Sequence, residues 1–315
     1  MGAGGSKPDK ESQVSTFETI LDSYETLEDV QGALRQAGLE SSHLILGLDF
    51  TKSNEWTGVN SFGGQCLHAV NVEINPYQEA ISIIARTLAS FDDDHLIPCY
   101  GFGDATTGDT GVFSFYQNDV QAHGLDSVLQ RYKQMAPFVQ LAGPTSFAPL
   151  IKQAMKVVVD SGNKYHILVI VADGQVTPTC LKDTINAIVA ASHLPLSIIM
   201  VGVGDGPWET MQVFDDQLPV RKFDNFQFVN FHEVKAQAAV YSEMKKREAH
   251  FALHALMEIP LQYRTIVKLG LLQSSKSKGH LKGMEPNLMP PPPAVMQADM
   301  MAMAGTMNPS APPQM

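Results

Sequence analysis

The sequence predicts an α/β fold, a doubly wound and mostly parallel sheet of the Rossmann type with helices on both faces. Short runs of almost entirely apolar residues, such as His43–Leu48 and Ile167–Ala172, are typical of strands that are buried on both faces. Amphipathic segments of roughly 10–15 residues separate these runs, with apolar residues three and four positions apart. Strands and helices that alternate in this way form a parallel sheet covered by helices.

The individual elements follow from local signals. An amphipathic helix is expected from Thr16 to Gly38, where glycine suits the C-cap, and Pro76 marks the first turn of the next helix. The further helices are expected at 76–90, 124–135, 149–160, 181–192, 208–214 and 233–257. The strands are expected at 43–48, 96–101, 112–116, 167–172, 196–201 and 226–231.

Both ends of the chain differ from this pattern. Residues 1–15 are small and polar, which predicts a flexible arm, and the domain is expected to span residues 16–270. Residues 271–315 are rich in proline and methionine and contain no aromatic residue. Such a composition predicts a disordered tail.

Composition excludes several classes of protein. The formal net charge of −11 argues against a general nucleic-acid binder, which needs a basic surface. Only three cysteines are present, Cys66, Cys99 and Cys180, in no CxxC pair, and we expect them to be buried thiols. They exclude a disulfide framework and a four-thiolate zinc module, which favours an intracellular setting. No apolar run reaches the roughly 18 residues of a membrane span.

Oxygen-bearing side chains gather where ligands bind in such folds, beyond the carboxyl ends of the strands. The first strand runs into Asp49, Thr51 and Ser53, a later loop carries Thr145, and the strongest strand ends at Asp173. Carboxylates and hydroxyls without histidine or cysteine suit a hard cation such as Mg²⁺. Taken alone, an Asp-x-Thr-x-Ser triplet is also common in turns and helix caps. The two further residues in the expected order favour the metal.

This constellation resembles the metal-ion-dependent adhesion site of von Willebrand factor A domains, in the copine-type variant with threonine at position 51. Blocks at 75–81, 96–104, 141–151, 171–177, 194–208, 223–231 and 255–264 are similar to copine sequences. Residues 16–270 are therefore expected to form a copine-type von Willebrand factor A domain. The segment DFTKSNEWTG at 49–58 most resembles the plant RGLG-type RING ubiquitin ligases.

The resemblance implies a metal-dependent interaction with other proteins. It implies that the five residues hold Mg²⁺ or Mn²⁺, and that an acidic side chain of a partner completes the coordination. The expected function is an intracellular protein-interaction module with no catalytic site in this chain. The alternative is an RGLG-type E3 ubiquitin ligase, with partners in the ubiquitin pathway. A RING needs eight cysteine or histidine ligands and no cysteine follows Cys180, so the RING is expected to be missing from this chain or gene model.

The amino terminus carries a lipidation signal. Gly2 follows the initiator methionine and Ser6 stands at the position expected for N-myristoylation. The alternative is an arm that is never acylated. A myristoyl chain would give peripheral contact with the plasma membrane in an otherwise cytoplasmic protein, with the nucleus as a further compartment.

Other residues have simpler interpretations. Gly202–Gly206 predicts a tight turn rather than a phosphate loop, because the third glycine of GxGxxG is missing. Asp104 is expected either to orient the metal ligands or to be a turn residue. His250 and His254 are expected on a helix face, and Trp56 is equally compatible with an exposed binding anchor and with core packing.

Overall fold

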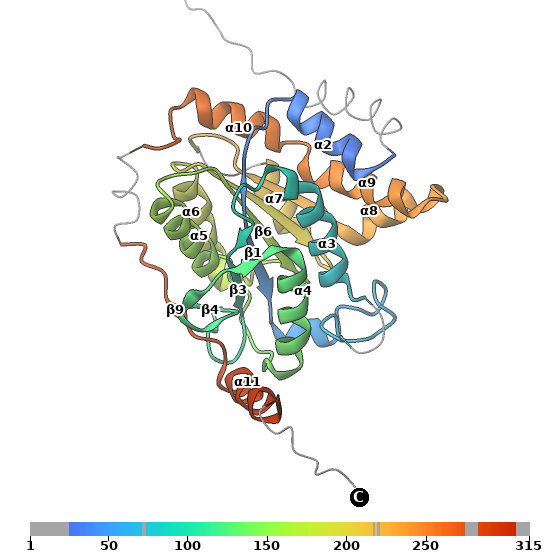
Figure 1. Cartoon of the computed structure of the whole chain (residues 1–315), viewed down its shortest axis with the longest axis vertical. Helices are drawn as coiled ribbons and strands as arrows, with labels where there is room; N and C mark the ends of the chain where they lie inside the picture. The colour runs from blue at the N-terminus through green and yellow to red at the C-terminus, as the bar shows by residue number, and fades with distance from the viewer. Residues whose placement is uncertain (1–24, 71–73, 217, 219–220, 275–282, 307–315) are drawn as a thin grey trace, which may run out of the picture.

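A computed structural model describes residues 25–70, 74–216, 218, 221–274 and 283–306 of the 315-residue chain. The main sheet has seven strands in the order β8-β7-β6-β1-β3-β4-β9, and Figure 1 labels β6, β1, β3, β4 and β9 among them. Its strands are β1 (His43–Asp49), β3 (Cys99–Phe102), β4 (Val112–Ser114), β6 (His166–Ala172), β7 (Leu196–Gly202), β8 (Phe226–Asn230) and β9 (Leu288–Met289). All adjacent pairs are parallel except β3 with β4. The predicted fold class is confirmed.

Helices cover both faces of this sheet and bury its central strands completely (Figure 1). One layer contains α2 (Leu27–Gln36), α3 (Pro76–Leu88), α4 (Gly124–Met135), α9 (Met244–Leu256) and α10 (Ile259–Lys268). The other contains α5 (Ala148–Asp160), α6 (Leu181–Ala191) and α7 (Glu209–Asp216). Each layer packs its apolar stripe on one face of the sheet, so the core has two halves.

The start of α2 illustrates how local sequence sets a helix boundary. Thr26 and Asp29 form a reciprocal capping box, in which each side chain accepts a hydrogen bond from the other residue's backbone N–H. The helix expected from Thr16 thus begins at Leu27 in the structure, and residues 16–24 lie outside the described part.

Two predicted elements are interrupted. The strand expected at 96–101 divides at Pro98 into β2 (Leu96–Ile97) and β3, and β2 pairs instead with β5 (Ala122–His123). Proline lacks the N–H that a continuous central strand needs, although its carbonyl still accepts a hydrogen bond from Leu46 N at 2.9 Å.

The prediction of one continuous helix at 233–257 was wrong. It is α8 (Phe231–Gln237), a 3-10 turn, and then α9. The break lets the rings of Phe231 and Phe251 meet edge to face, 4.8 Å apart. Residues 20 positions apart on one straight helix would lie about 30 Å from each other.

The tail expected to be disordered from residue 271 is ordered over part of its length. Strand β9 pairs with the outer side of β4, and α11 (Pro293–Thr306) follows. Two hydrogen bonds of 2.6 and 2.9 Å join the Arg131 guanidinium to the Asp299 carboxylate, and Val295 is buried. Strand β9 pairs with the open edge of β4, and the composition of the tail alone could not reveal this pairing. Within the described ranges, no helix combines the length and apolarity needed to cross a membrane.

Candidate metal centre

Strands β1 and β6 are neighbours, and this pairing brings the two predicted acidic ligands to one edge of the sheet. Leu48 lies opposite Val171 in the parallel ladder, so Asp49 at the end of β1 and Asp173 just after β6 leave the sheet side by side. Their position is the carboxyl edge, where open α/β sheets bind ligands.

A chain of hydroxyls connects the two acids. The backbone N–H of Thr51 donates to Asp49 Oδ1 at 2.8 Å, and the hydroxyls of Thr51 and Ser53 lie 3.0 Å apart. Ser53 Oγ then donates to Asp173 Oδ1 at 3.0 Å. Four of the five predicted ligands therefore form one connected group.

Hydrogen bonds of the backbone hold the loop of Thr145 at the same edge of the sheet. Its loop is attached to the Asp49 loop by a hydrogen bond of 2.7 Å from Lys52 N to the Ala142 carbonyl. It is attached to the loop after β6 by two hydrogen bonds of 3.0 Å with Thr177, one through the Thr177 hydroxyl. Thr145 is buried, and the three loops that carry the predicted ligands are joined to one another.

Thr57 is a member of this cluster that the sequence did not single out. Its hydroxyl donates to Asp173 Oδ2 at 2.5 Å. The same hydroxyl lies 2.9 Å from the Ser53 carbonyl, four residues earlier. The spacing of Ser53 and Thr57, one helical turn after the Asp-x-Thr-x-Ser motif, is the signal that could have identified it.

Both carboxyl groups are buried, and this burial makes their negative charge unfavourable. Burial raises the pKa of Asp49 well above its usual value, and the nearby charge of Asp173 raises it further. Burial also raises the pKa of Asp173, against the lowering effect of hydrogen bonds from Thr57 and Ser53. Asp49 Oδ2 is buried and accepts no hydrogen bond from the described residues.

These observations fit a hard divalent cation. An acceptor oxygen without a donor, beside a second buried carboxylate, is an arrangement that a cation would stabilise. The available donors are carboxylate and hydroxyl oxygens, as Mg²⁺ or Mn²⁺ requires. Asp49, Thr51, Ser53, Thr145 and Asp173 would hold the ion.

A buried polar layer supports the Asp49 backbone from below. His68 Nε2 and the Tyr77 hydroxyl both donate to the Asp49 carbonyl, at 2.7 and 3.1 Å. His68 Nδ1 lies 2.7 Å from the hydroxyl of Tyr132, and its ring stacks on that of Phe50. Burial lowers the pKa of His68 to about 4, so this imidazole is neutral at pH 7 and adds no competing positive charge.

Two glycines allow the loops to approach the acids closely. A Cβ atom on Gly103 would lie 2.4 Å from Thr51 Cγ2, and its φ of +78° disfavours other residues. A Cβ atom on Gly204 would lie 2.5 Å from the Asp173 carbonyl oxygen. The Gly202–Gly206 segment is thus the turn that packs over the Asp173 loop, and Asp205 accepts hydrogen bonds from the N–H groups of Asn60 and Ser61.

Asp104 shapes its own loop. Its carboxylate accepts hydrogen bonds from the backbone N–H and the hydroxyl of both Thr106 and Thr107. Of the two roles expected from sequence, these contacts favour the turn residue. Gly103, its neighbour, is the part of this loop that approaches Asp49.

Apolar side chains are exposed beside the metal loops. Trp56 is 55% exposed, which excludes core packing, and Val59 and Ile74 are 63% and 67% exposed. A cavity of about 320 Å³ is lined by Ser61, Phe62, Ile74 and Val203 among others. Exposed apolar residues around a polar centre are typical of a protein-binding surface.

The remaining residues singled out from sequence lie elsewhere. His250 is buried in α9, and its ring lies 4.6 Å from the ring of His254, which is one helical turn further along the same helix. Cys99 and Cys180 are buried as expected, whereas Cys66 is only half-buried. Gly2 lies outside the described residues.

Comparison with known proteins identifies close relatives. The copine family profile matches residues 66–275. The chain is 54% identical over 266 residues to E3 ubiquitin-protein ligase RGLG5 of Arabidopsis thaliana, covering 81% of this chain and 61% of that protein. It is 51% identical to E3 ubiquitin-protein ligase RGLG3 of the same plant, covering 89% and 77%. It is 49% identical to copine family protein 2 of Caenorhabditis elegans, covering 80% and 3%.

This chain spans less than two thirds of the length of RGLG5 and of two further curated relatives from the same plant, RGLG2 and RGLG1. Among solved structures, a von Willebrand factor type A protein from Catenulispora acidiphila is similar at a TM-score of 0.41 and 14% identity, over 68% of this chain and 43% of that one. Manganese-loaded Plasmodium vivax TRAP protein is similar at a TM-score of 0.40 and 12% identity, over 62% and 71%.

Proposed function

The chain belongs to the copine family, and from this premise we propose that it binds partner proteins through a divalent cation at the carboxyl edge of its sheet. Asp49, Thr51, Ser53, Thr145 and Asp173 would hold Mg²⁺ or Mn²⁺, directly or through water. The observation that carries the proposal is Asp49 Oδ2, a buried oxygen that accepts no hydrogen bond from a donor within the described residues and lies beside a second buried acid.

The protein residues prepare the site before any partner arrives. Hydrogen bonds from Thr51 N, Ser53 and Thr57 orient the two carboxylates, and the His68 and Tyr77 layer holds the backbone of Asp49. A bound cation supplies a coordination position for a partner's acidic side chain. Exposed Trp56 beside the site is suited to contact the surface around that acid.

The first test measures the cation directly. Isothermal titration of the chelator-treated protein with Mg²⁺ should show one site, and Asp49→Ala should abolish it. Asp93→Asn, which removes an exposed carboxylate elsewhere in the fold, is the matched control and should bind as the wild type does. Equal Mg²⁺ binding by wild type and Asp49→Ala would contradict the ligand set.

The second test concerns partners. Proteins captured by the immobilised wild-type chain in Mg²⁺ should be released by EDTA and should not be retained by Asp49→Ala. Capture that persists unchanged in EDTA excludes a metal-bridged interaction, even if the cation itself binds.

A second candidate function follows from the relatives, several of which are named E3 ubiquitin-protein ligases. We propose that this domain serves as the partner-binding part in ubiquitin transfer, while a RING supplied elsewhere recruits the conjugating enzyme. No cysteine follows Cys180 in this sequence, so the chain alone should build no ubiquitin conjugates in a reconstituted assay. Conjugates formed by the chain alone would refute this division of roles.

We also propose that Gly2 is myristoylated, which would bring a cytoplasmic protein to the plasma membrane. The support is the sequence pattern of Gly2 and Ser6. Intact mass of the chain purified from eukaryotic cells should show the acyl group, and Gly2→Ala should lack it. An unmodified amino terminus in the wild type would refute the proposal.

A further inference from the structure

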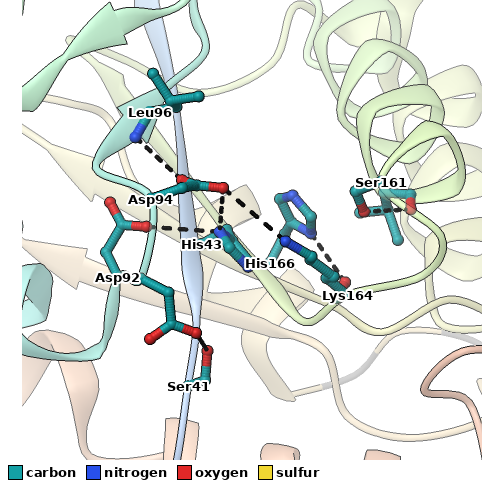
Figure 2. A network of polar contacts seen from close by, with 10 residues as sticks. Ser41, His43, Asp92, Asp94, Leu96, Ser161, Lys164 and His166 are labelled. Carbon is teal, nitrogen blue, oxygen red and sulfur yellow. Dashed lines mark hydrogen bonds and ion pairs between the residues drawn. The ribbon is translucent and has the colours of Figure 1, made fainter.

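We propose a second metal site, for a transition-metal ion such as Zn²⁺, at the amino end of strand β1, opposite the carboxyl ends where the first centre lies. Its ligands are His43, Asp92 and Asp94. His43 is the first residue of β1, and the two acids lie in the loop before β2 (Figure 2). The proposal is independent of the partner-binding function, because it shares no residue with that site.

The distances match the spacing of ligands around one ion. His43 Nδ1 lies 3.5 Å from Asp92 Oδ1 and 3.5 Å from Asp94 Oδ2, and all three ligand atoms lie within 4.8 Å of one another. Tetrahedral zinc has ligand bonds of about 2.0–2.1 Å, which places neighbouring ligand atoms about 3.3 Å apart. Separations of 3.5 Å are also longer than an ordinary N–H···O hydrogen bond. Small side-chain movements would therefore complete the coordination.

The protein holds each ligand in this arrangement. The backbone N–H of Leu96 donates to Asp94 Oδ1 at 3.1 Å, which leaves Oδ2 turned to His43, as Figure 2 shows. Hydrogen-bonded carboxylates and a fixed imidazole are characteristic of metal ligands. Asp92 is 9% exposed, and its Oδ1 faces His43 Nδ1 at 3.5 Å without an ordinary hydrogen bond from the described residues. An ion between these two atoms would replace their long ion pair with two short bonds.

There is also room for a water ligand. A cavity of about 250 Å³ opens beside the cluster and is lined by His43, Asp94, Lys164 and His166 among others. Lys164 Nζ lies 4.0 Å from Asp94 Oδ2, but this side chain is half exposed and can turn to solvent. It is the one charged group that an incoming cation must displace from the described surroundings of Asp94.

The donor set selects the class of metal. One imidazole nitrogen and two carboxylates suit Zn²⁺ and related ions, whereas Mg²⁺ prefers oxygen ligands alone. The all-oxygen centre around Asp49 and the mixed centre around His43 would therefore take different ions in the same solution. The competing explanation is an ion pair, in which a protonated His43 is held by the two acids without metal.

The test titrates the chelator-treated chain with Zn²⁺ in excess Mg²⁺, which fills the carboxyl-edge centre, and repeats the titration with Co²⁺ as a coloured probe. We expect one Zn²⁺ per chain and an intense Co²⁺ absorption typical of tetrahedral coordination. Asp94→Asn should weaken Zn²⁺ binding at least about tenfold, because removing even a residue that hydrogen-bonds a metal ligand lowers metal affinity by about that factor. Asp93→Asn, one position earlier and bonded instead to Ser41, should bind normally.

Three outcomes would overturn the site. Absence of the tetrahedral Co²⁺ signal would leave His43 as part of an ion pair. Equal binding by the Asp93 and Asp94 variants would show that total charge, rather than this geometry, attracts the metal. Loss of Zn²⁺ binding in Asp49→Ala but not in Asp94→Asn would place the zinc at the other edge. Because Asp49→Ala should otherwise keep this site intact, failure of either metal centre can be recognised separately.

Discussion

Replacing Asp49 by asparagine should have opposite effects on stability with and without metal. The amide keeps an oxygen for the hydrogen bond from Thr51 N, and it removes a buried negative charge beside Asp173. Its NH₂ group replaces Asp49 Oδ2, an oxygen that accepts no hydrogen bond from the described residues. In EDTA at pH 7, Asp49→Asn should therefore unfold at a higher temperature than the wild type.

The expected direction follows from the raised pKa of Asp49, because burial and the charge of Asp173 disfavour its ionised form. Each kcal/mol gained by removing that charge should raise the melting temperature by about 2–4 °C in a domain of this size. A group whose folded pKa is raised stabilises the fold below its unfolded pKa and loses that contribution as pH rises through the folded value. The advantage of the asparagine variant should accordingly shrink as the pH is lowered from 7 toward 4.

Bound metal should reverse the order of the two melting temperatures, so that the wild type unfolds at the higher temperature. A ligand at about 100 times its Kd adds about 2.7 kcal/mol to the wild type, equivalent to about 5–10 °C, and the variant should gain almost nothing. Thermal unfolding followed by circular dichroism, in EDTA and in Mg²⁺, measures both differences. The reasoning is refuted if Asp49→Asn melts below the wild type in EDTA, or if Mg²⁺ stabilises both proteins equally.

Three further changes test other parts of the structure. The folded pKa of His68 is about 4, whereas an unfolded histidine titrates near about 6.5. The free energy of unfolding measured in urea should therefore decrease as the pH is lowered from about 6.5 to about 4, by up to about 1.4 kcal/mol per pH unit. Gly103→Ala forces a Cβ against Thr51 at positive φ, so it should cost about 1–3 kcal/mol in urea unfolding and weaken Mn²⁺ binding. Asp299→Asn should loosen α11 from Arg131, seen as faster proteolysis within residues 293–306.

Each of these changes has a contradicting result and a control. An NMR titration in which His68 gains its proton near pH 6.5 would contradict its burial as the neutral form. Gly63→Ala is the control for Gly103, because Gly63 has a φ of +60° but no atom within 4 Å of its added Cβ, and metal binding should survive there. Unchanged cleavage of α11 in Asp299→Asn would show that this ion pair does not hold the helix.

The proximity of Asp49 and Asp173 was predictable from the sequence. An acid at the end of one parallel strand must lie near an acid at the end of its neighbour, so Asp49 and Asp173 could be placed together without coordinates. Thr57 was missed because its role depends on the tight turn at 52–55, which returns its hydroxyl to Asp173. His68 was missed because its hydrogen bond to the Asp49 carbonyl joins segments that no local pattern connects.

Sequence by itself determined the alternation of strands and helices, because apolar runs and helical periodicity are local properties that the sheet and its two helical layers preserve. Only tertiary structure decided where those patterns stop. The break before α9 accompanies the packing of Phe231 on Phe251, and β9 forms because β4 offers an unpaired edge. The cluster of His43, Asp92 and Asp94 likewise exists only because the start of β1 lies beside the loop before β2. Such contacts join residues distant along the chain, and their free energy appears only when the chain is folded.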